Sequence, residues 1–200
     1  MLSERIMRIL MLGPDLSVKG GISSVERLMV DNCPDGVEIS FRPTMHDRSI
    51  FGRLTHFFPR LMETFFQSKK NNFDLVHVHF SHSLSTLRKH SLIRRWVRRG
   101  IPVVAHSHSS SYVDFFRSRG KYSRKLISSG LKRCSMLVVL SNSWKEFYRE
   151  EVGVEGKNIF VLQNPTKLVK RIDPKLKPKP IRVLFSGRIG ERKGTFDLIN

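Results

Sequence analysis

Short apolar runs alternate with helix-like stretches over most of the chain. The runs are apolar at successive positions, as parallel strands covered by helices on both faces should be. Repeated βαβ units give this alternation, so the sequence predicts an α/β fold with a doubly wound, mainly parallel sheet. The predicted strands are Ile6–Leu12, Val37–Phe41, Leu75–Phe80, Pro102–His106, Met136–Leu140 and Ile159–Leu162.

Three stretches between these runs have the periodicity of helices. Residues Gly21–Asp31 and Ser83–Arg99 are the first two, and Gly100-Ile101-Pro102 ends the second. Ser143-Trp144-Lys145-Glu146 has the pattern of a capping box and predicts a third helix that ends near Gly153. The apolar positions of the first two helices are Ile22, Val25, Leu28 and Met29, and Leu84, Leu87, Leu92 and Trp96.

A change of composition near residue 165 predicts a domain boundary. Residues 166–180 contain three prolines and many basic residues and have little to bury, which is typical of a linker. A new apolar run begins at Ile181. We therefore expect one domain over residues 1–165, a linker over 166–180, and the first strand, loop and helix start of a second, incomplete domain over 181–200.

The strongly positive net charge indicates that the chain contacts an anionic partner. The 200 residues carry 36 Lys and Arg against 17 Asp and Glu, a formal net charge of +19. Much of the excess lies between Arg42 and Arg133, so nucleic acid, an anionic membrane face and a phosphorylated substrate are all open. Residues 51–70 place phenylalanines beside Arg and Lys, which suits contact with anionic lipid and equally suits the core face of a packed helix. Cys33 and Cys134 lack metal-ligand spacing and are expected to be reduced thiols of a cytoplasmic protein.

The loop after the first predicted strand is the first candidate site. Its glycines Gly20 and Gly21 lead directly into a helix, where backbone N–H groups can approach a phosphate. The loop is not G-x-G-x-x-G, and no acidic residue ends the second strand, so a dinucleotide cofactor is disfavoured. A turn whose glycines serve only its geometry is an equally good interpretation of this loop alone.

Histidines form the second candidate. His77 and His79 share one face of a strand, and His106 and His108 end the next one, so they converge on one crevice. No metal-binding motif accompanies them, and we expect polar packing rather than metal binding for His77 and His106. His108 is the best candidate for contact with a reacting group.

The third candidate is the basic loop Gly187–Gly194. Arg188 offers a planar fork of donors and Lys193 a point charge next to a predicted helix N-terminus, a combination that would hold a diphosphate. The alternative interpretation is a basic surface turn.

Taken together, these segments resemble family 4 of the retaining glycosyltransferases of GT-B fold. The resemblance rests on Lys19-Gly20-Gly21, on FDLVHVHF, on VVAHSHSS, on LVVLSNSWKEFY with VLQNP, and on VLFSGRIGERKGTFDLI. It implies two Rossmann-like domains and transfer of a sugar from a nucleotide sugar, such as a UDP- or GDP-sugar, with retention of configuration. Gly20 and Gly21 match the loop near donor phosphates and acceptor, His108 the active-site histidine, and Arg188 and Lys193 the donor-diphosphate site.

The resemblance also sets expectations about partners and completeness. It implies no catalytic metal and no cofactor, and a saccharide or lipid-linked acceptor in cell-surface polysaccharide or glycolipid synthesis, reached from the cytoplasmic face of the membrane. Gln163-Asn164-Pro165 departs from the family's usual turn. The family's pair of glutamates in the second domain has no counterpart before Asn200, so we expect a truncated chain with little or no transfer activity.

A different class of function stays open on the sequence. A basic binding module could associate with an anionic membrane or with nucleic acid without catalysis. No pattern for specific nucleic-acid recognition is present, so such binding to nucleic acid would be salt-sensitive and nonspecific. The sequence does not name the sugar, the nucleotide, the acceptor or the oligomeric state.

Overall fold

The computed structural model describes residues 5–45, 73–82, 84–166, 180, 183–187, 189–191 and 194–199. The chain divides into two compact units, Met1–Thr166 and Lys167–Asn200. Most of the predicted linker lies outside the described residues, as does the Phe-rich segment 51–70. The predicted linker and the predicted membrane contact of that segment therefore stay predictions.

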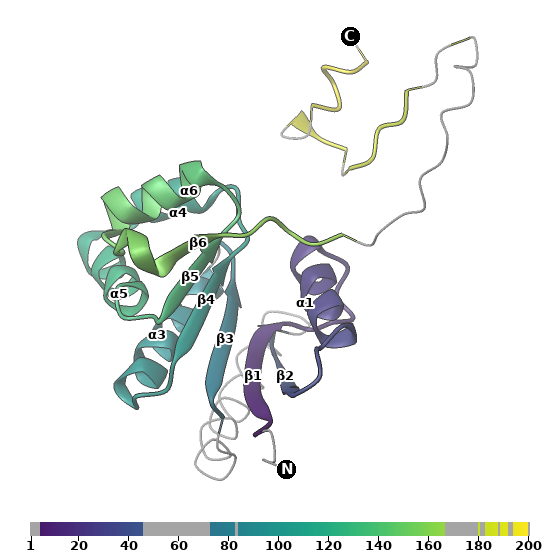
Figure 1. Ribbon diagram of the computed structural model, residues 1–200. Coiled ribbons are helices and arrows are strands. Elements are labelled where there is room, and N and C mark those ends of the chain that lie inside the picture. The colour runs from purple at the N-terminus through teal and green to yellow at the C-terminus, as the bar shows by residue number, and fades with distance from the viewer. Residues whose placement is uncertain are drawn as a thin grey trace. The chain divides into compact units, whose positions relative to one another are not determined.

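The first unit is built on a sheet of six parallel strands in the order β2-β1-β3-β4-β5-β6. This sheet with flanking helices confirms the predicted Rossmann-like α/β fold (Figure 1). The second strand continues four residues beyond its predicted end because it pairs with β1 as far as Pro14, with a register shift after Gly13. The strands are β1 Met7–Pro14, β2 Val37–Met45, β3 Leu75–Phe80, β4 Val103–Ser107, β5 Met136–Val139 and β6 Ile159–Val161.

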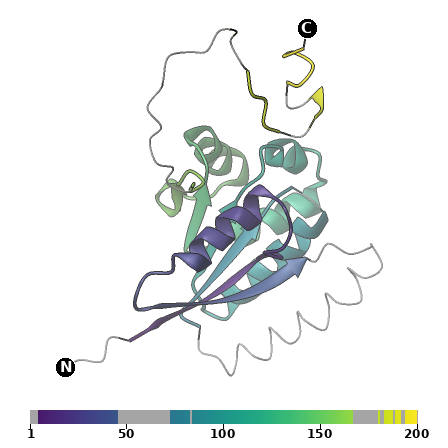
Figure 2. The ribbon, with the colours of Figure 1, turned by 90° about the vertical axis from the view of Figure 1, so that its right-hand side faces the viewer.

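Helices cover both faces of the sheet. Helix α1 lies on one face, in front of the sheet in Figure 2, and α3 and α5 lie on the other (Figure 1). The periodicity did not predict α4 or α5, whose sequences are short or rich in serine. The helices are α1 Gly21–Asp31, α3 Leu84–Arg98, α4 Tyr112–Arg117, α5 Lys121–Leu131 and α6 Asn142–Phe147, with a π-helical turn η1 at Tyr148–Val152 and a 3-10 turn η2 at Gly156–Asn158.

Two helix C-termini lie where the sequence predicted them, and one predicted helix N-terminus is wrong. Gly100 and Gly153 have φ angles of 73° and 79°, the left-handed conformation that ends α3 and η1 where expected. The predicted capping box at Ser143 is wrong. Helix α6 begins at Asn142 after Ser141, and the Ser141 hydroxyl lies 2.8 Å from the Ser143 hydroxyl, so neither caps the backbone.

The two faces of the sheet differ in chemistry because side chains alternate along each strand. On β3, Val76, Val78 and Phe80 are buried towards α3 and α5, while His77 and His79 point to the α1 side. The apolar face carries the main core. Its largest members are Leu10, Phe80, Ile93, Trp96, Tyr112, Ile127, Leu131, Leu137 and Tyr148.

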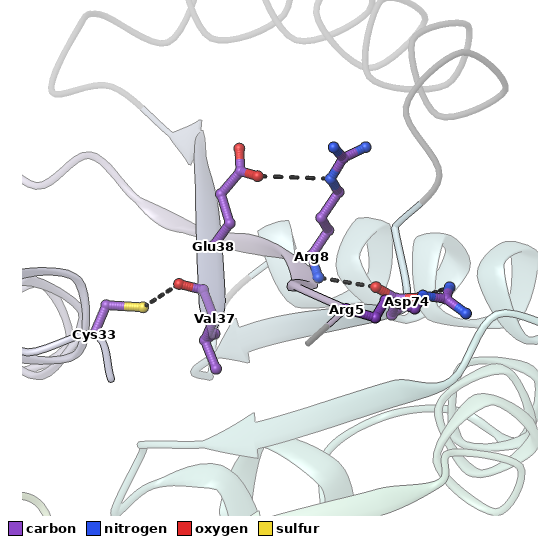
Figure 3. A network of polar contacts seen from close by, with 6 residues as sticks. All are labelled: Arg5, Arg8, Cys33, Val37, Glu38 and Asp74. Carbon is purple, nitrogen blue, oxygen red and sulfur yellow. Dashed lines mark hydrogen bonds and ion pairs between the residues drawn. The ribbon is translucent and has the colours of Figure 1, made fainter. Parts of the chain in front are cut away.

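The starts of the strands are held by a carboxylate at the edge opposite the candidate site. Asp74 accepts hydrogen bonds from the Arg5 guanidinium at 2.5 Å and from the Arg8 backbone at 2.9 Å (Figure 3). The Arg8 N–H bond and the Arg5 charge lower the pKa of Asp74. This contact fixes β1 beside β3, and Arg8 also lies 3.6 Å from Glu38 on β2.

Two further expectations concern cysteine and the membrane. Cys33 and Cys134 are both free, as predicted, and Cys33 donates to the Val37 carbonyl at 3.2 Å (Figure 3). Within the described ranges, no helix is both long enough and apolar enough to cross a bilayer.

Candidate functional site

The chain reverses its winding direction between β1 and β3. After β1 it proceeds to β2 on one side, and β3 then lies on the other side of β1. The loops that leave β1 and β3 therefore part in opposite directions and open a crevice at the carboxyl ends of these strands. Open α/β sheets bind their ligands at such a switch point. The Gly20-Gly21 loop follows β1, His77 and His79 lie on β3, and His108 follows β4, the neighbour of β3.

The loop after β1 is a compact turn built on Asp15. The Asp15 carboxylate accepts hydrogen bonds from the backbone N–H and the hydroxyl of Ser17 at 2.9 and 2.7 Å. The backbone carbonyl of Asp15 accepts a hydrogen bond from the Ser23 hydroxyl on α1 at 3.2 Å. Arg27 of α1 also donates to the Leu16 carbonyl. The turn is thus tied to the first two turns of α1, which fixes where that helix begins.

Gly20 and Gly21 are placed in open space at this helix start. A Cβ added at either residue would meet no atom of the described chain within 4 Å, and neither has a left-handed φ. The fold itself therefore does not require glycine at these two positions. A phosphate or acceptor loop needs space for its ligand, and this need would explain why both residues are glycine. The prediction of such a loop stays a prediction.

Gly13 at the end of β1 is different, because it is required for packing. A Cβ there would lie 1.5 Å from the Oε1 atom of Glu26. Glu26 projects from α1 onto the sheet and is completely buried. Since Leu12 pairs with Val78, Gly13 and with it Glu26 lie beside His79 of β3. The missing side chain of Gly13 is what admits a carboxyl group to the crevice.

His79 connects Glu26 to His108. The His79 Nδ1 atom is 3.9 Å from Glu26 Oε1 and 2.8 Å from His108 Nε2. His108 follows β4 directly, and its backbone N–H donates to the Phe80 carbonyl at 3.1 Å, which holds the residue at the end of β3. The side chain of Asn164, after β6, lies near His108, whose Nδ1 atom has no hydrogen-bond partner among the described residues. His108 is thus held by two residues of β3.

Burial keeps these groups uncharged near neutral pH. Desolvation raises the pKa of Glu26 to about 8, against the lowering effect of the Lys89 charge. Desolvation lowers the pKa of His108 to about 4, although the nearby Asn164 side chain opposes that shift. The pKa of His79 is also lowered, first by burial and then by its histidine neighbours. His108 is therefore a neutral imidazole that can exchange hydrogen bonds with a hydroxyl group.

Lys89 is the charged group next to this neutral cluster. It is buried on α3, and its ammonium donates to the His79 carbonyl at 2.6 Å. Its charge lowers the pKa of Glu26, His79 and His108 alike, which shows that all three feel its field. A buried positive charge beside neutral imidazoles favours an anionic ligand.

A second bridge ties the two loops of the crevice together. His82, after β3, contacts the Ser109 hydroxyl after β4 through its Nδ1 atom, and Ser109 also accepts from the Ser111 backbone at 3.2 Å. The Ser81 carbonyl accepts from Thr86 at the start of α3. These bonds fix the loops on both sides of His108.

The predicted diphosphate loop belongs to the second unit. Arg188 and Lys193 lie outside the described residues, so their predicted role stays a prediction. Between them, the Gly190 N–H donates to the Thr195 hydroxyl at 3.1 Å and the Gly194 N–H to the Glu191 carbonyl at 2.9 Å. The described part of this loop is therefore a hydrogen-bonded turn.

Glu26 and Lys89 were not predicted from the sequence. Glu26 lies four residues after Ile22 on α1, within the face that was interpreted as apolar, and a charge at such a position was the available signal. The buried residues of α1 are in fact Ser23, Val25 and Glu26, whereas Ile22, Leu28 and Met29 are only partly buried. Lys89 lies three residues before Leu92 and seven before Trp96, on the apolar face of α3, so a charge within that face was again the available signal.

Comparison with known proteins agrees with this fold. A search of the curated proteins found no significant match. A family model, Glycosyltransferase Family 4, matches residues 24–169. The matched segment runs from α1 through β6 and includes Glu26, His79, His108 and Asn164, and it begins after Gly21. Such a match over most of the chain supports a glycosyltransferase-type function, and the chain belongs to glycosyltransferase family 4.

Proposed function

We propose that this chain takes part in the transfer of a sugar from a nucleotide sugar to a saccharide or lipid-linked acceptor, with retention of configuration. The observation that carries the proposal is the position of His108. It lies at the end of β4, beside the topological switch point of a domain that belongs to the family, and it is held there by His79 and the Phe80 carbonyl.

In this proposal His108 contacts the reacting sugar or the acceptor hydroxyl. One proton is shared between His79 Nδ1 and His108 Nε2, because both rings are neutral and their nitrogens are 2.8 Å apart. His79 therefore positions the ring and occupies its Nε2 atom, which leaves Nδ1 of His108 for Asn164 or a substrate hydroxyl. Glu26 and Gly13 in turn position His79.

The charge of the leaving nucleoside diphosphate would be stabilised by cations rather than by a metal. Lys89 supplies a positive field in the crevice. Arg188 and Lys193 are proposed to bind the diphosphate directly, and preorganised charges of this kind contribute strongly to transfer reactions. Gly20 and Gly21 leave space at the positive end of α1 for a phosphate or the acceptor. A basic surface suits an acceptor presented on the cytoplasmic face of an anionic membrane.

Nucleotide binding and turnover test the proposal. The chain is incubated with a panel of UDP- and GDP-sugars, and bound nucleotide and released nucleoside diphosphate are measured. We expect selective binding of one nucleotide, and any slow turnover should fall at least about tenfold in His108→Ala. His90→Gln is a matched control, because it removes a buried histidine on the opposite face of the sheet while its amide can still reach the Tyr112 hydroxyl.

The same experiment separates enzyme from binding module. Binding to anionic vesicles or to duplex DNA without binding of any nucleotide sugar would contradict the proposal and favour the noncatalytic alternative. Gly21→Val sharpens the assignment of the loop. It should leave unfolding within about 0.5 kcal/mol of wild type, because no atom lies within 4 Å of its Cβ, and still weaken substrate binding.

A further inference from the structure

Three histidines on the α1 side of the sheet form a cluster that the proposed function does not use fully. His77 and His79 stand on β3, and His106 stands opposite His79 on β4. Their ring centroids are 4.2 Å apart for His77 and His79, 5.0 Å for His79 and His106, and 5.6 Å for His77 and His106. One ring nitrogen from each lies within 4.8 Å of the others. The register of β3 and β4 places the three residues side by side.

The ring nitrogens of this cluster need an occupant. Within the described part of the chain, the Nε2 atoms of His77 and His79 and both nitrogens of His106 are buried without a hydrogen-bond partner. The two carboxyl oxygens of Glu26 are in the same situation. Buried polar atoms are nearly always paired, and aliphatic or phenyl side chains would fill this space without the desolvation penalty. So many unpartnered atoms at one place indicate a ligand that accepts several of them together.

A divalent transition metal fits the donor set. Imidazole nitrogen suits zinc and its neighbours, and three histidines with an open position are a known arrangement for zinc. At a metal–nitrogen distance of about 2.1 Å, the nitrogens of a tetrahedral site are about 3.4 Å apart. The three nitrogens, already within 4.8 Å of one another, reach that spacing by small ring rotations.

We propose that His77, His79 and His106 bind a divalent transition metal of the zinc class through one ring nitrogen each. Glu26 Oε1 is 3.9 Å from the Nδ1 atom of His79. Since the partnerless nitrogen of His79 is Nε2, Glu26 lies on the side of the ring that faces away from the metal and supports the ring there. The site does not depend on the proposed sugar transfer.

Metal binding would fix the proton of the His79–His108 pair. A metal on the Nε2 atom of His79 forces the proton to Nδ1, from which it is donated to His108 Nε2 at 2.8 Å. His108 then carries its own proton on Nδ1 and is a donor on that side. The metal would thus set the hydrogen-bonding direction of His108 without touching a substrate.

Titration of the metal-free chain tests the site. The protein is treated with a chelator, exchanged into buffer and titrated with Zn²⁺ by calorimetry, and Co²⁺ is added separately to record its visible absorption. We expect one equivalent of Zn²⁺, an intense Co²⁺ band typical of tetrahedral coordination, and affinity at least about 100-fold lower in His106→Phe. His90→Gln, a buried histidine on the opposite face of the sheet, should bind as wild type does.

Two measurements keep the test decisive. Far-UV circular dichroism establishes that His106→Phe is folded, and His77→Gln provides a second variant if it is not. Equal affinity in wild type and in a folded ligand variant would overturn the proposal, because the metal would then bind elsewhere. Absence of a stoichiometric Zn²⁺ complex, or of the Co²⁺ band, would overturn it as well.

Discussion

Two groups of buried histidines on opposite faces of one sheet have different environments. On the α3 side, His90 packs edge-on to Phe80 with a centroid distance of 5.1 Å and bonds the Tyr112 hydroxyl at 2.7 Å. On the α1 side, His106 is equally buried but lies among imidazoles, and its nitrogens lack partners within the described residues. His90 is therefore a structural residue of the core. The α1-side histidines are the ones that we propose to bind a ligand.

The aromatic core around His90 is also the main source of stability. Tyr112 and Tyr148 are completely buried, and the Tyr148 hydroxyl lies 2.8 Å from that of Ser107 on β4. Phe80 links this core to the crevice, because it follows His79 on β3 and points the opposite way. Alternate residues of β3 thus have different roles. Phe80 packs in the core, whereas His79 belongs to the candidate site on the other face.

The largest expected effect is the loss of the ring that joins the two regions. Phe80→Ala should destabilise the fold by about 3–5 kcal/mol, because Phe80 is fully buried and contacts both His90 and Tyr112. Chemical denaturation measures the change. Phe160→Ala is the matched control, since that ring is 49% exposed on the edge strand β6. Equal losses in the two variants would contradict the assigned core.

The next largest effect on stability is expected from filling the space that the Glu26 carboxyl group occupies beside Gly13. Gly13→Ala should cost about 1–3 kcal/mol, because its Cβ would lie 1.5 Å from Glu26 Oε1 and the carboxyl must move. The double variant Gly13→Ala/Glu26→Ala should recover at least about 1 kcal/mol of the sum of the single losses. Gly21→Ala, in open space, serves as control. Strictly additive losses would mean that the two residues do not compete for one space.

The pH dependence of stability separates His90 from other titrating groups. Burial, and secondly the charge of Lys89, lower the pKa of His90 to about 3. The unfolded state therefore binds one more proton than the folded state between about pH 6.5 and 3, so stability falls as the pH falls through that range. At pH 5 this single residue should account for about 2 kcal/mol of lost stability relative to pH 7.

His90→Gln measures that contribution. The variant cannot titrate in this range, and its amide can still reach the Tyr112 hydroxyl. Its free energy of unfolding, followed from pH 7 to 5, should therefore decline by about 2 kcal/mol less than that of wild type. Parallel curves for the two proteins would show that His90 is protonated in the folded state or does not contribute.

The fold could be predicted from the sequence because its signals are local. Apolar runs such as Leu75–Phe80 gave the strands, and Gly100 and Gly153 marked helix ends through their left-handed conformation. Helices α4 and α5 were missed because tertiary packing forms them: Tyr112 and Ile127 are buried, yet the segments around them contain many polar residues. The capping box predicted at Ser143 was wrong because helix α6 begins at Asn142, directly after Ser141. A local motif therefore misplaces a helix start when a neighbouring serine takes that position.

The site could be predicted only where a single strand carries it. The alternation along β3 and the end of β4 placed His79 and His108 in one crevice, and the 2.8 Å contact between them confirms that convergence. The packing of Glu26 against Gly13 depends on the pairing of β1 with β3 and on the position of α1 on the sheet. Residue spacing in the sequence predicts neither of these. Asn164 was noted for its place in a turn, but its nearness to His108, which opposes the lowering of the pKa of that ring, brings the end of β6 to the end of β4.

The smallest expected effect is the sharpest comparison of the two histidine groups. His90→Phe should destabilise by about 1–2 kcal/mol, because the Tyr112 hydroxyl loses its partner in a buried site. The same substitution in the crevice, His106→Phe, keeps the ring volume and removes two nitrogens without partners among the described residues, so it should be neutral or slightly stabilising in metal-free buffer. Denaturation of both variants in the presence of a chelator measures the difference. A loss in His106→Phe equal to that in His90→Phe would mean that the crevice histidines also act as core residues, and the division between the two faces would then fail.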